Sequence, residues 1–229
     1  MPKAARDELD AAAELHVPTD LRALSTARLL GLILGRRCPH AAHAEADQIL
    51  QRYPLEQLPL VDLDTLMSGG SLGSARASRL LAAIELGRRA CTERALRECQ
   101  ARPITHRQDV ERWARPKLAA LCHEEVWLLS LDARHHLKGA DLVARGGTHG
   151  CSLLPKDVLR PAVRNAAAAI ILVHNHPSGD PTPSAEDLSM TECLIDACNA
   201  VGVPLLDHLV VAREGCTSIA ETMMDDRAA

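Results

Sequence analysis

Aromatic residues are nearly absent from this sequence, which has two Trp, one Tyr and no Phe among 229 residues. The core must therefore be built from Leu, Ile, Val and Ala, and hydrophobic residues make up 47% of the chain. Together with a charged fraction of 24%, this is the composition of a soluble globular protein. The length allows one large domain or two modest ones, each with a buried core.

Three further absences exclude whole classes of protein. The eight cysteines form no Cys-x-x-Cys pair, which argues against a zinc ribbon or a disulfide framework and favours free thiols in a reducing cytoplasm. No apolar stretch approaches the about 20 residues that cross a bilayer, and the charged N-terminus lacks the apolar segment of a secretory peptide. A net charge of −4 gives no general argument for nucleic-acid binding. We expect a cytoplasmic protein without membrane contact.

The first hundred residues are predicted to form a small all-helical domain. A short helix at residues 63–67 and a long helix at residues 75–97 are joined by a Gly/Ser-rich turn. This arrangement resembles a helix-hairpin-helix motif, whose backbone amides could hold a phosphate. Eight arginines between residues 76 and 107 would suit a nucleic-acid backbone, so DNA is a predicted partner of this domain. The expected helices cover residues 21–35, 44–53, 63–67 and 75–97, with the turn at 68–74.

Residues 101–108 are predicted to be a linker, and residues 109–229 a second domain. Runs of aliphatic and β-branched residues alternate there with helical patterns, which indicates an α/β or α+β domain of layered sheet and helices. The expected strands cover residues 126–131, 137–145, 166–173 and 205–211, and the expected helices residues 156–165 and 184–200.

The end of the third predicted strand carries the chemistry of the chain. His174 and His176 are two residues apart, so on a strand both imidazoles point to one side, with about 6–7 Å of backbone between them. A segment rich in Pro and Gly then turns the chain. A helix that begins near Ser184 places Asp187 in its first turn. Two imidazoles and a carboxylate suit Zn²⁺, and three protein ligands leave a position for water.

The segment from His174 to Asp187 resembles the motif of the RadC family, within the MPN/JAMM metalloprotease-like group: His-x-His, seven residues, Ser, two residues, Asp. Supporting matches lie at Gly146-Gly147-Thr148, Leu206–His208 and Ile84–Arg89, so the resemblance spans nearly the whole chain. It implies an MPN/JAMM-like (cytidine-deaminase-like) domain of sheet and helices after the small helical domain. It also implies hydrolysis of an amide or isopeptide bond in a peptide or protein substrate by a zinc-activated water.

The resemblance also implies a general base at the start of an early strand. Alignment of the apolar strand assigns this role to Glu124, with Glu125 as the alternative, because a shift of one residue exchanges the two faces of a strand. Where relatives have Gly-x-Gly in the helical hairpin, this chain has Ser71-Leu72-Gly73, a departure that weakens the case for a phosphate-holding turn.

The other polar residues around the motif receive simpler roles. Ser184 is expected either to stabilise the oxyanion of the tetrahedral intermediate or to cap the helix, with Asp187 completing a capping box. These two interpretations compete, since an Asp187 that binds zinc is not expected also to cap. Asn175 and Asp180 are predicted to form turns, and His208 to be structural.

Two alternatives to a zinc peptidase stay open. One is a DNA-associated accessory protein, in keeping with the family's traditional DNA-repair label, in which the metal site is structural or vestigial. The other is a metal-dependent nuclease, suggested by the letters His-Asn-His. That nuclease motif consists of dispersed residues, which a contiguous triplet at a strand end matches poorly.

Overall fold

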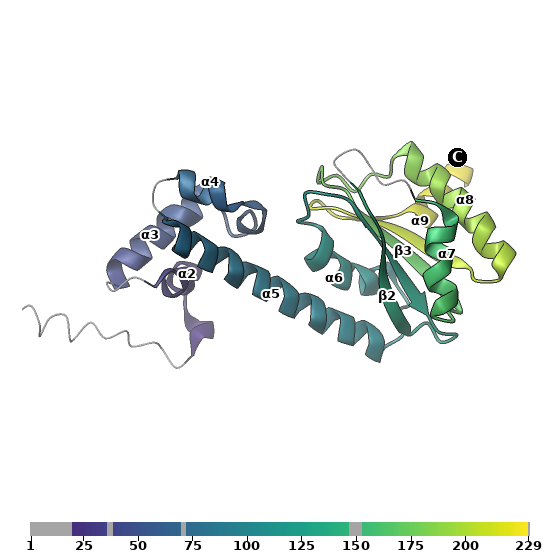
Figure 1. The fold of residues 1–229 in the computed structure, drawn as a ribbon, viewed down its shortest axis with the longest axis horizontal. Coiled ribbons are helices and arrows are strands. Elements are labelled where there is room, and N and C mark those ends of the chain that lie inside the picture. The colour runs from purple at the N-terminus through teal and green to yellow at the C-terminus, as the bar shows by residue number, and fades with distance from the viewer. Residues whose placement is uncertain (1–19, 36–38, 70–71, 147–152, 229) are drawn as a thin grey trace, which may run out of the picture. The chain divides into compact units, whose positions relative to one another are not determined.

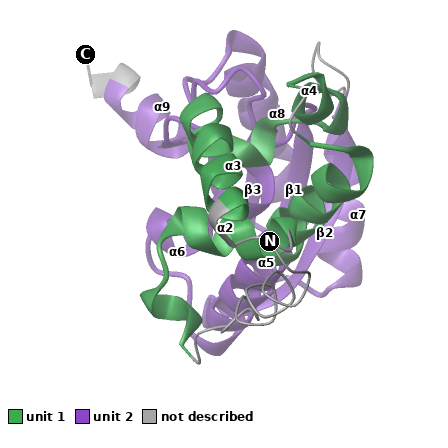
Figure 2. Ribbon diagram, turned by 90° about the vertical axis from the view of Figure 1, so that its left-hand side faces the viewer, with its two compact units in different colours: residues 1–87 green, residues 88–229 purple. Residues whose placement is uncertain are grey.

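The computed structural model of the protein describes residues 20–35, 39–69, 72–146 and 153–228 (Figure 1). The chain divides into two compact units, residues 1–87 and 88–229 (Figure 2). Helix α5 (Ser74–Ala101) contributes its first part to unit 1 and its second part to unit 2. Ser71, Gly147 and Thr148, which the sequence analysis singled out, lie outside the described residues.

Unit 1 is helical, as predicted. Ser25 and Asp62 accept hydrogen bonds from the first turns of α2 and α4, and Gly35 ends α2 with a φ of 65°. Its buried core is aliphatic and contains Leu34, Leu66 and Leu80. A phosphate at the turn between α4 and α5 stays a prediction. The elements before α5 are η1 (Leu21–Ala23), α2 (Thr26–Leu34), α3 (Pro39–Arg52), η2 (Leu58–Leu60) and α4 (Leu63–Ser68).

Unit 2 contains a five-stranded sheet with the strand order β2-β1-β3-β4-β5. Strands β3 and β4 are parallel, and the other neighbours are antiparallel. The mixed α/β class predicted from the sequence is confirmed. The strands are β1 (Glu125–Leu131), β2 (Leu137–Arg145), β3 (Ala169–Asn175), β4 (Leu205–Val211) and β5 (Cys216–Ser218).

Helices cover both faces of the sheet (Figure 1). On β3, Ile171 and Val173 pack in one cluster with Trp113 of α6, whereas Leu172 packs in another with α7 and α8. The alternation of side chains along a strand therefore directs His174 to the face covered by α7 and α8. The helices of this unit after α5 are α6 (Arg107–Leu118), α7 (Pro155–Arg164), α8 (Ala185–Val201) and α9 (Ile219–Ala228).

Helix α6 was not predicted from the sequence, and β3 begins later than predicted. Helix α6 is capped by Asp109, whose carboxylate accepts hydrogen bonds from the amides of Thr105 and His106. Strand β3 begins at Ala169 rather than at residue 166, because Ala166 has a φ of 47° in the turn that follows α7. As a result the strand extends to Asn175 and includes the first histidine of the motif.

None of the helices in the described part of the chain combines the length and the apolar character that a membrane crossing requires. The cysteines that the structure describes carry free thiols, as the sequence predicts: Cys91, Cys99, Cys122, Cys193, Cys198 and Cys216.

Leu172 offers a test of the core beneath the motif. It is 0% exposed at the centre of β3, so Leu172→Ala should lower the free energy of unfolding by about 2–5 kcal/mol. Val163→Ala is the matched control on the exterior of α7, where Val163 is 62% exposed, and should change it by no more than about 0.5 kcal/mol. Urea denaturation measures both, and equal losses would contradict this placement of the core.

Candidate metal centre

Three segments of unit 2 meet at the end of β3. His174 is part of the strand, His176 follows it, and Asp187 lies in the first turn of α8. Strand β1 pairs antiparallel with β3, with Val126 opposite His174. This register brings Glu124, just before β1, to the level of His176. The strand pairing and the helix start thus gather residues that are far apart in the sequence.

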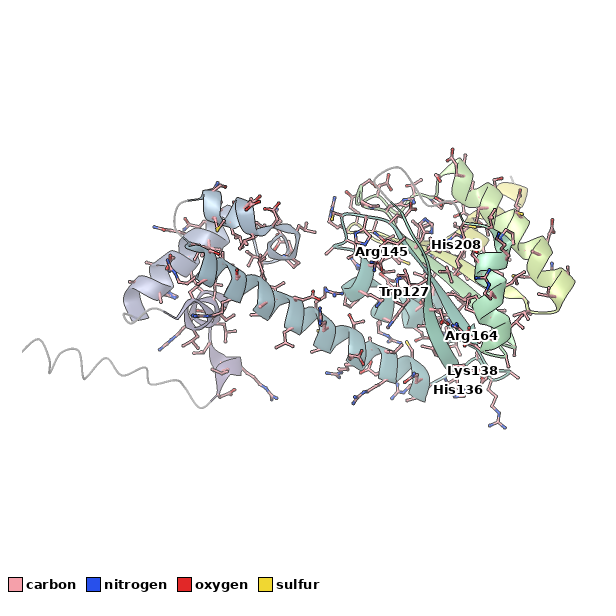
Figure 3. All side chains as sticks on the ribbon, in the orientation of Figure 1. Trp127, His136, Lys138, Arg145, Arg164 and His208 are labelled. Atoms are coloured by element: carbon pink, nitrogen blue, oxygen red, sulfur yellow. The ribbon has the colours of Figure 1, made fainter. Side chains whose placement is uncertain are left out.

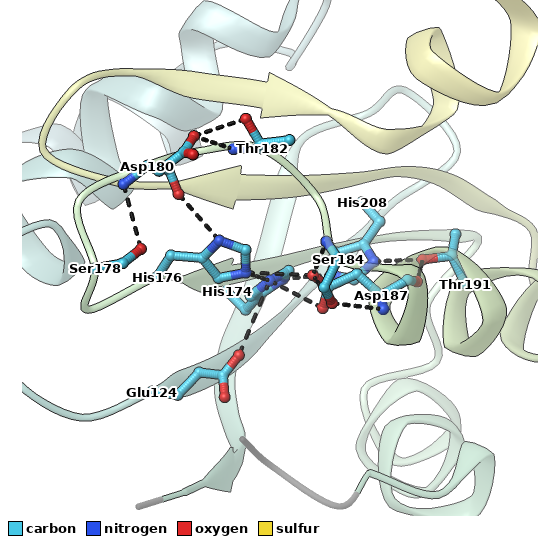
Figure 4. Close-up of polar contacts among 10 residues, drawn as sticks. All are labelled: Glu124, His174, His176, Ser178, Asp180, Thr182, Ser184, Asp187, Thr191 and His208. Carbon is cyan, nitrogen blue, oxygen red and sulfur yellow. Dashed lines mark hydrogen bonds and ion pairs between the residues drawn. The ribbon is translucent and has the colours of Figure 1, made fainter. Parts of the chain in front are cut away.

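The side chains of these four residues form one group (Figure 4). Nε2 of His174 lies 3.0 Å from Nε2 of His176 and 3.2 Å from Oδ1 of Asp187. Nε2 of His176 lies 3.2 Å from Oδ2 of the same carboxylate, and Oε1 of Glu124 is 4.0 Å from Nε2 of His174. One ligand atom from each residue lies within 4.8 Å of all the others, so the group could hold a metal ion.

The outer nitrogen of His176 is held by the loop that follows. Its Nδ1 lies 3.0 Å from the carbonyl oxygen of Asp180, which can only accept, so Nδ1 carries a hydrogen and donates it. Asp180 also forms the predicted turn, because its carboxylate accepts from the amide and hydroxyl of Thr182. The loop therefore leaves Nε2 of His176 to face the centre of the group.

Gly179 allows this loop to close. Its φ is 101°, and a Cβ there would lie 2.7 Å from Nη2 of Arg213. The same Nη2 donates to the carbonyl of Ser178, and the amide of Glu214 donates to the carbonyl of Gly179. The turn that carries Asp180 is thus anchored to the residues after β4.

Asp187 both caps α8 and faces the histidines. Its Oδ2 accepts hydrogen bonds from the amide and hydroxyl of Ser184, while Oγ of Ser184 accepts from the amide of Asp187. The capping box is present and the same carboxylate lies 3.2 Å from both histidines, because a carboxylate has enough lone pairs for both contacts. Zinc binding by Asp187 stays a prediction. The predicted role of Ser184 as an oxyanion donor stays a prediction.

The pKa values in the group reflect mutual attraction. Burial acts to raise the pKa of Asp187, but the adjacent rings of His174 and His176 and the hydroxyl of Ser184 hold it far below its usual value. The hydrogen bond with Asp187 raises the pKa of His176 against the opposing effect of burial. The carboxylate is therefore an anion that favours positive charge beside it.

Glu124 rather than Glu125 joins the group. The carboxylate of Glu125 accepts hydrogen bonds from Nε1 of Trp127 and from Arg145 on the neighbouring strand, and it contacts His123. Trp127 and Arg145 are labelled in Figure 3. Burial acts to raise the pKa of Glu125, but hydrogen bonds from Trp127, His123 and Arg145 keep it below its usual value. Of the two candidates for a base, Glu124 alone lies within 4.8 Å of the histidines and Asp187.

Asn175 has a different place from the one predicted. It is not a turn residue but the buried last residue of β3, 1% exposed, and it points away from the face of His174. Its Oδ1 accepts from the amide of Glu125 at 2.9 Å, and its Nδ2 donates to the carbonyl of His123 at 3.0 Å. The side chain thus fastens both backbone neighbours of Glu124 to the strand that carries the histidines.

A line of two further buried polar residues, His208 and Thr191, begins at His174. Its Nδ1 is 2.8 Å from Nε2 of His208 on β4, and Nδ1 of His208 is 2.6 Å from the hydroxyl of Thr191 on α8. Burial, and then the proximity of His174, place the pKa of His208 well below its usual value. From the sequence His208 is predicted to be structural, and Thr191 lies within the helix predicted at residues 184–200, since neither has a recognisable spacing to the motif.

Comparison with known proteins agrees with this geometry. Residues 104–224 match the RadC-like JAB domain family. A UPF0758 protein of Methanosarcina mazei is 34% identical over 190 residues, which are 82% of this chain and 81% of that protein. A UPF0758 protein of Syntrophomonas wolfei is 36% identical over 191 residues, 82% and 81% of the two chains. UPF0758 protein lmo1549 of Listeria monocytogenes is 32% identical over 203 residues, 88% and 89%. With a JAB domain of the metallohydrolase type and most of its length matched by these relatives, the chain belongs to the RadC family.

Proposed function

We propose that the protein is a zinc-dependent hydrolase that cleaves an amide or isopeptide bond in a peptide or protein substrate. The observation that carries the proposal is the convergence of His174, His176, Asp187 and Glu124 within 4.8 Å in a JAB domain. Two imidazole nitrogens and one carboxylate oxygen are the donor set of many catalytic zinc sites, and they leave one position open for water.

The donor atoms fit a cation for a physical reason. Nδ1 of His176 already donates to a carbonyl, so its free lone pair is on Nε2. That nitrogen lies 3.0 Å from Nε2 of His174, and both are 3.2 Å from the Asp187 carboxylate. Polar atoms this close repel each other unless a hydrogen or a cation lies between them. Bound there by His174, His176 and Asp187, Zn²⁺ would polarise a water molecule and lower its pKa towards about 7.

In the proposed mechanism Glu124 moves the proton of that water. Its carboxylate oxygen is 4.0 Å from Nε2 of His174, adjacent to the three donor atoms yet farther out, as a base beside a ligand set should be. Asn175 fixes the backbone on both sides of it. In the proposed reaction Glu124 takes the proton from the attacking water and returns it to the leaving amine.

Ser184 has a supporting role in the proposed reaction. Its hydroxyl hydrogen is directed to Oδ2 of Asp187 at 2.7 Å, so it orients that carboxylate. Donation to a developing oxyanion requires the hydrogen to be released from Asp187. A DNA-related role of the helical unit and a cytoplasmic location stay predictions.

Metal analysis tests the ligand set. The purified protein should contain about one zinc per chain, and Asp187→Ala should abolish zinc binding while the fold survives. Asp109→Ala is a matched control, because Asp109 also accepts amide hydrogen bonds at a helix start but lies outside the group. It should lose some stability and keep its zinc. A folded wild type that binds no zinc would contradict the proposal.

Replacement of Glu124 separates binding from turnover. Glu124→Gln should retain zinc but lose hydrolysis by about 10²–10⁴-fold, because the amide cannot accept the proton of the water. Cleavage of a proteome-derived peptide library, read by mass spectrometry, provides the assay. Glu186→Gln, an exposed acid in the first turn of α8, is the control and should cleave like the wild type. Full turnover by Glu124→Gln would remove Glu124 from the mechanism.

The metal-free protein should show the opposite pH dependence to the zinc-loaded one. Asp187 raises the folded-state pKa of His176, so protonated His176 stabilises the fold below about 6.5, and this stabilisation disappears as the pH rises through the folded-state value. After chelation, the wild type should lose stability relative to His176→Gln as the pH rises above about 6.5. Zinc should stabilise it more at the higher pH, because protons compete with the metal. Parallel profiles of wild type and variant would contradict this assignment.

A further inference from the structure

A line of close polar contacts leads away from His174 through two buried side chains from different elements. His208 of β4 is 0% exposed and Thr191 of α8 is 2% exposed. Figure 4 shows them in line behind His174, on the side away from Glu124. Neither reaches the point where the donor atoms converge, yet each is within 2.8 Å of its neighbour in the line. Buried polar groups so closely spaced must each have a defined hydrogen position.

The hydroxyl of Thr191 determines the direction of the line. Its Oγ1 lies 2.6 Å from the carbonyl oxygen of Asp187 and 2.6 Å from Nδ1 of His208. A carbonyl can only accept, and two oxygens at this distance repel without a hydrogen between them, so the single hydrogen of Thr191 points to Asp187. Thr191 must then accept from His208, which places the hydrogen of His208 on Nδ1.

The same reasoning passes to His174. A second hydrogen on His208 would create a cation in a completely buried position, where no carboxylate of the described residues hydrogen-bonds to the ring, so Nε2 of His208 carries a lone pair. Across 2.8 Å that lone pair requires a donor, which is Nδ1 of His174. The lone pair of a neutral His174 is then on Nε2, the nitrogen beside His176 and Asp187.

We propose that His208 is a positioning residue, itself fixed by Thr191, that holds the hydrogen of His174 on Nδ1 and so presents the Nε2 lone pair to the metal. This inference rests on the proposed zinc site for its purpose, but the hydrogen positions follow from the contacts alone. The carbonyl of Asp180 acts on His176 in the same way, because it holds the hydrogen of that ring on Nδ1. Both imidazoles are thereby held in the form that binds metal, with the hydrogen on Nδ1. The loop fixes this form for His176, and His208 fixes it for His174.

The carboxylate of Asp187 favours a different hydrogen position on His174, and experiment can distinguish the two positions. It lies 3.2 Å from Nε2 of His174 and attracts a hydrogen to that nitrogen. If His208 did nothing, a neutral His174 would carry its hydrogen on Nε2 and leave Nδ1 bare. With His208 accepting, Nδ1 carries a hydrogen whether the ring is neutral or doubly protonated. An Nδ1 of His174 without a hydrogen is therefore expected only if His208 has no influence on that ring.

Nitrogen-15 NMR of the histidine side chains in chelated, full-length wild type provides the test. Two-bond correlations distinguish ring nitrogens with and without a hydrogen, and the variants His174→Gln and His208→Gln assign the two rings. We expect a hydrogen on Nδ1 of His174, a hydrogen on Nδ1 of His208, and a bare Nε2 of His208. A bare Nδ1 on His174, or a hydrogen on Nε2 of His208, would overturn the inference.

Zinc affinity, measured by competition with a chelator, provides the second readout. His208→Leu removes the acceptor and should weaken zinc binding by about 10–100-fold, whereas His208→Gln can supply both an acceptor and a donor and should recover part of the loss. Thr191→Val should weaken zinc in the same direction. Cys198→Ala, a buried change on the same helix outside the line, should lower stability and leave zinc affinity unchanged.

The outcomes separate this inference from the proposed function. A wild type that binds no zinc refutes the zinc hydrolase, while the NMR measurement still decides the hydrogen positions. A wild type that binds zinc, with a folded His208→Leu variant of equal affinity, refutes the positioning role and leaves the hydrolase intact. If His208→Leu does not fold, Thr191→Val and the wild-type spectrum decide.

Discussion

The close approach of two imidazole nitrogens and a carboxylate is the constraint on which the rest of the site depends. Nε2 of His174 and Nε2 of His176 lie 3.0 Å apart, and each is 3.2 Å from an oxygen of Asp187. In a partly buried position, polar atoms this close repel one another unless a hydrogen or a cation lies between them. A proton can meet the requirement in part, and a divalent cation meets it fully. The surrounding hydrogen bonds hold the donors in place against that repulsion.

Each donor is held by a different part of the fold. The parallel pairing of β3 with β4 places His174 beside His208, the loop around Gly179 holds His176, and the capping box of α8 orients Asp187. Glu124 is carried by the pairing of β1 with β3 and fastened by Asn175. The group therefore lies where two strands of the sheet, the loop after β3 and the start of one helix meet.

The sequence was sufficient where local periodicity decides the structure. Two histidines two apart at the end of an apolar strand, and a carboxylate three residues after a capping serine, have predictable directions, and the structure brings His174, His176 and Asp187 together. It was insufficient where a partner strand decides. The burial of Asn175 and the line from Thr191 to His208 depend on strand order and register, which one sequence does not contain. The late start of β3 had a local cause, because an alanine-rich run suits a turn and a strand equally well.

X-ray absorption at the zinc edge tests the central claim most directly, because it reports the atoms bound to the metal. The account predicts two imidazole nitrogens and oxygen ligands at about 2.0–2.2 Å, and no sulfur, in a chain with eight cysteines. Asp187→Ala should remove this spectrum. A sulfur shell at about 2.3 Å, or a zinc environment without imidazole, would contradict the account, since the metal would then be bound elsewhere in the chain.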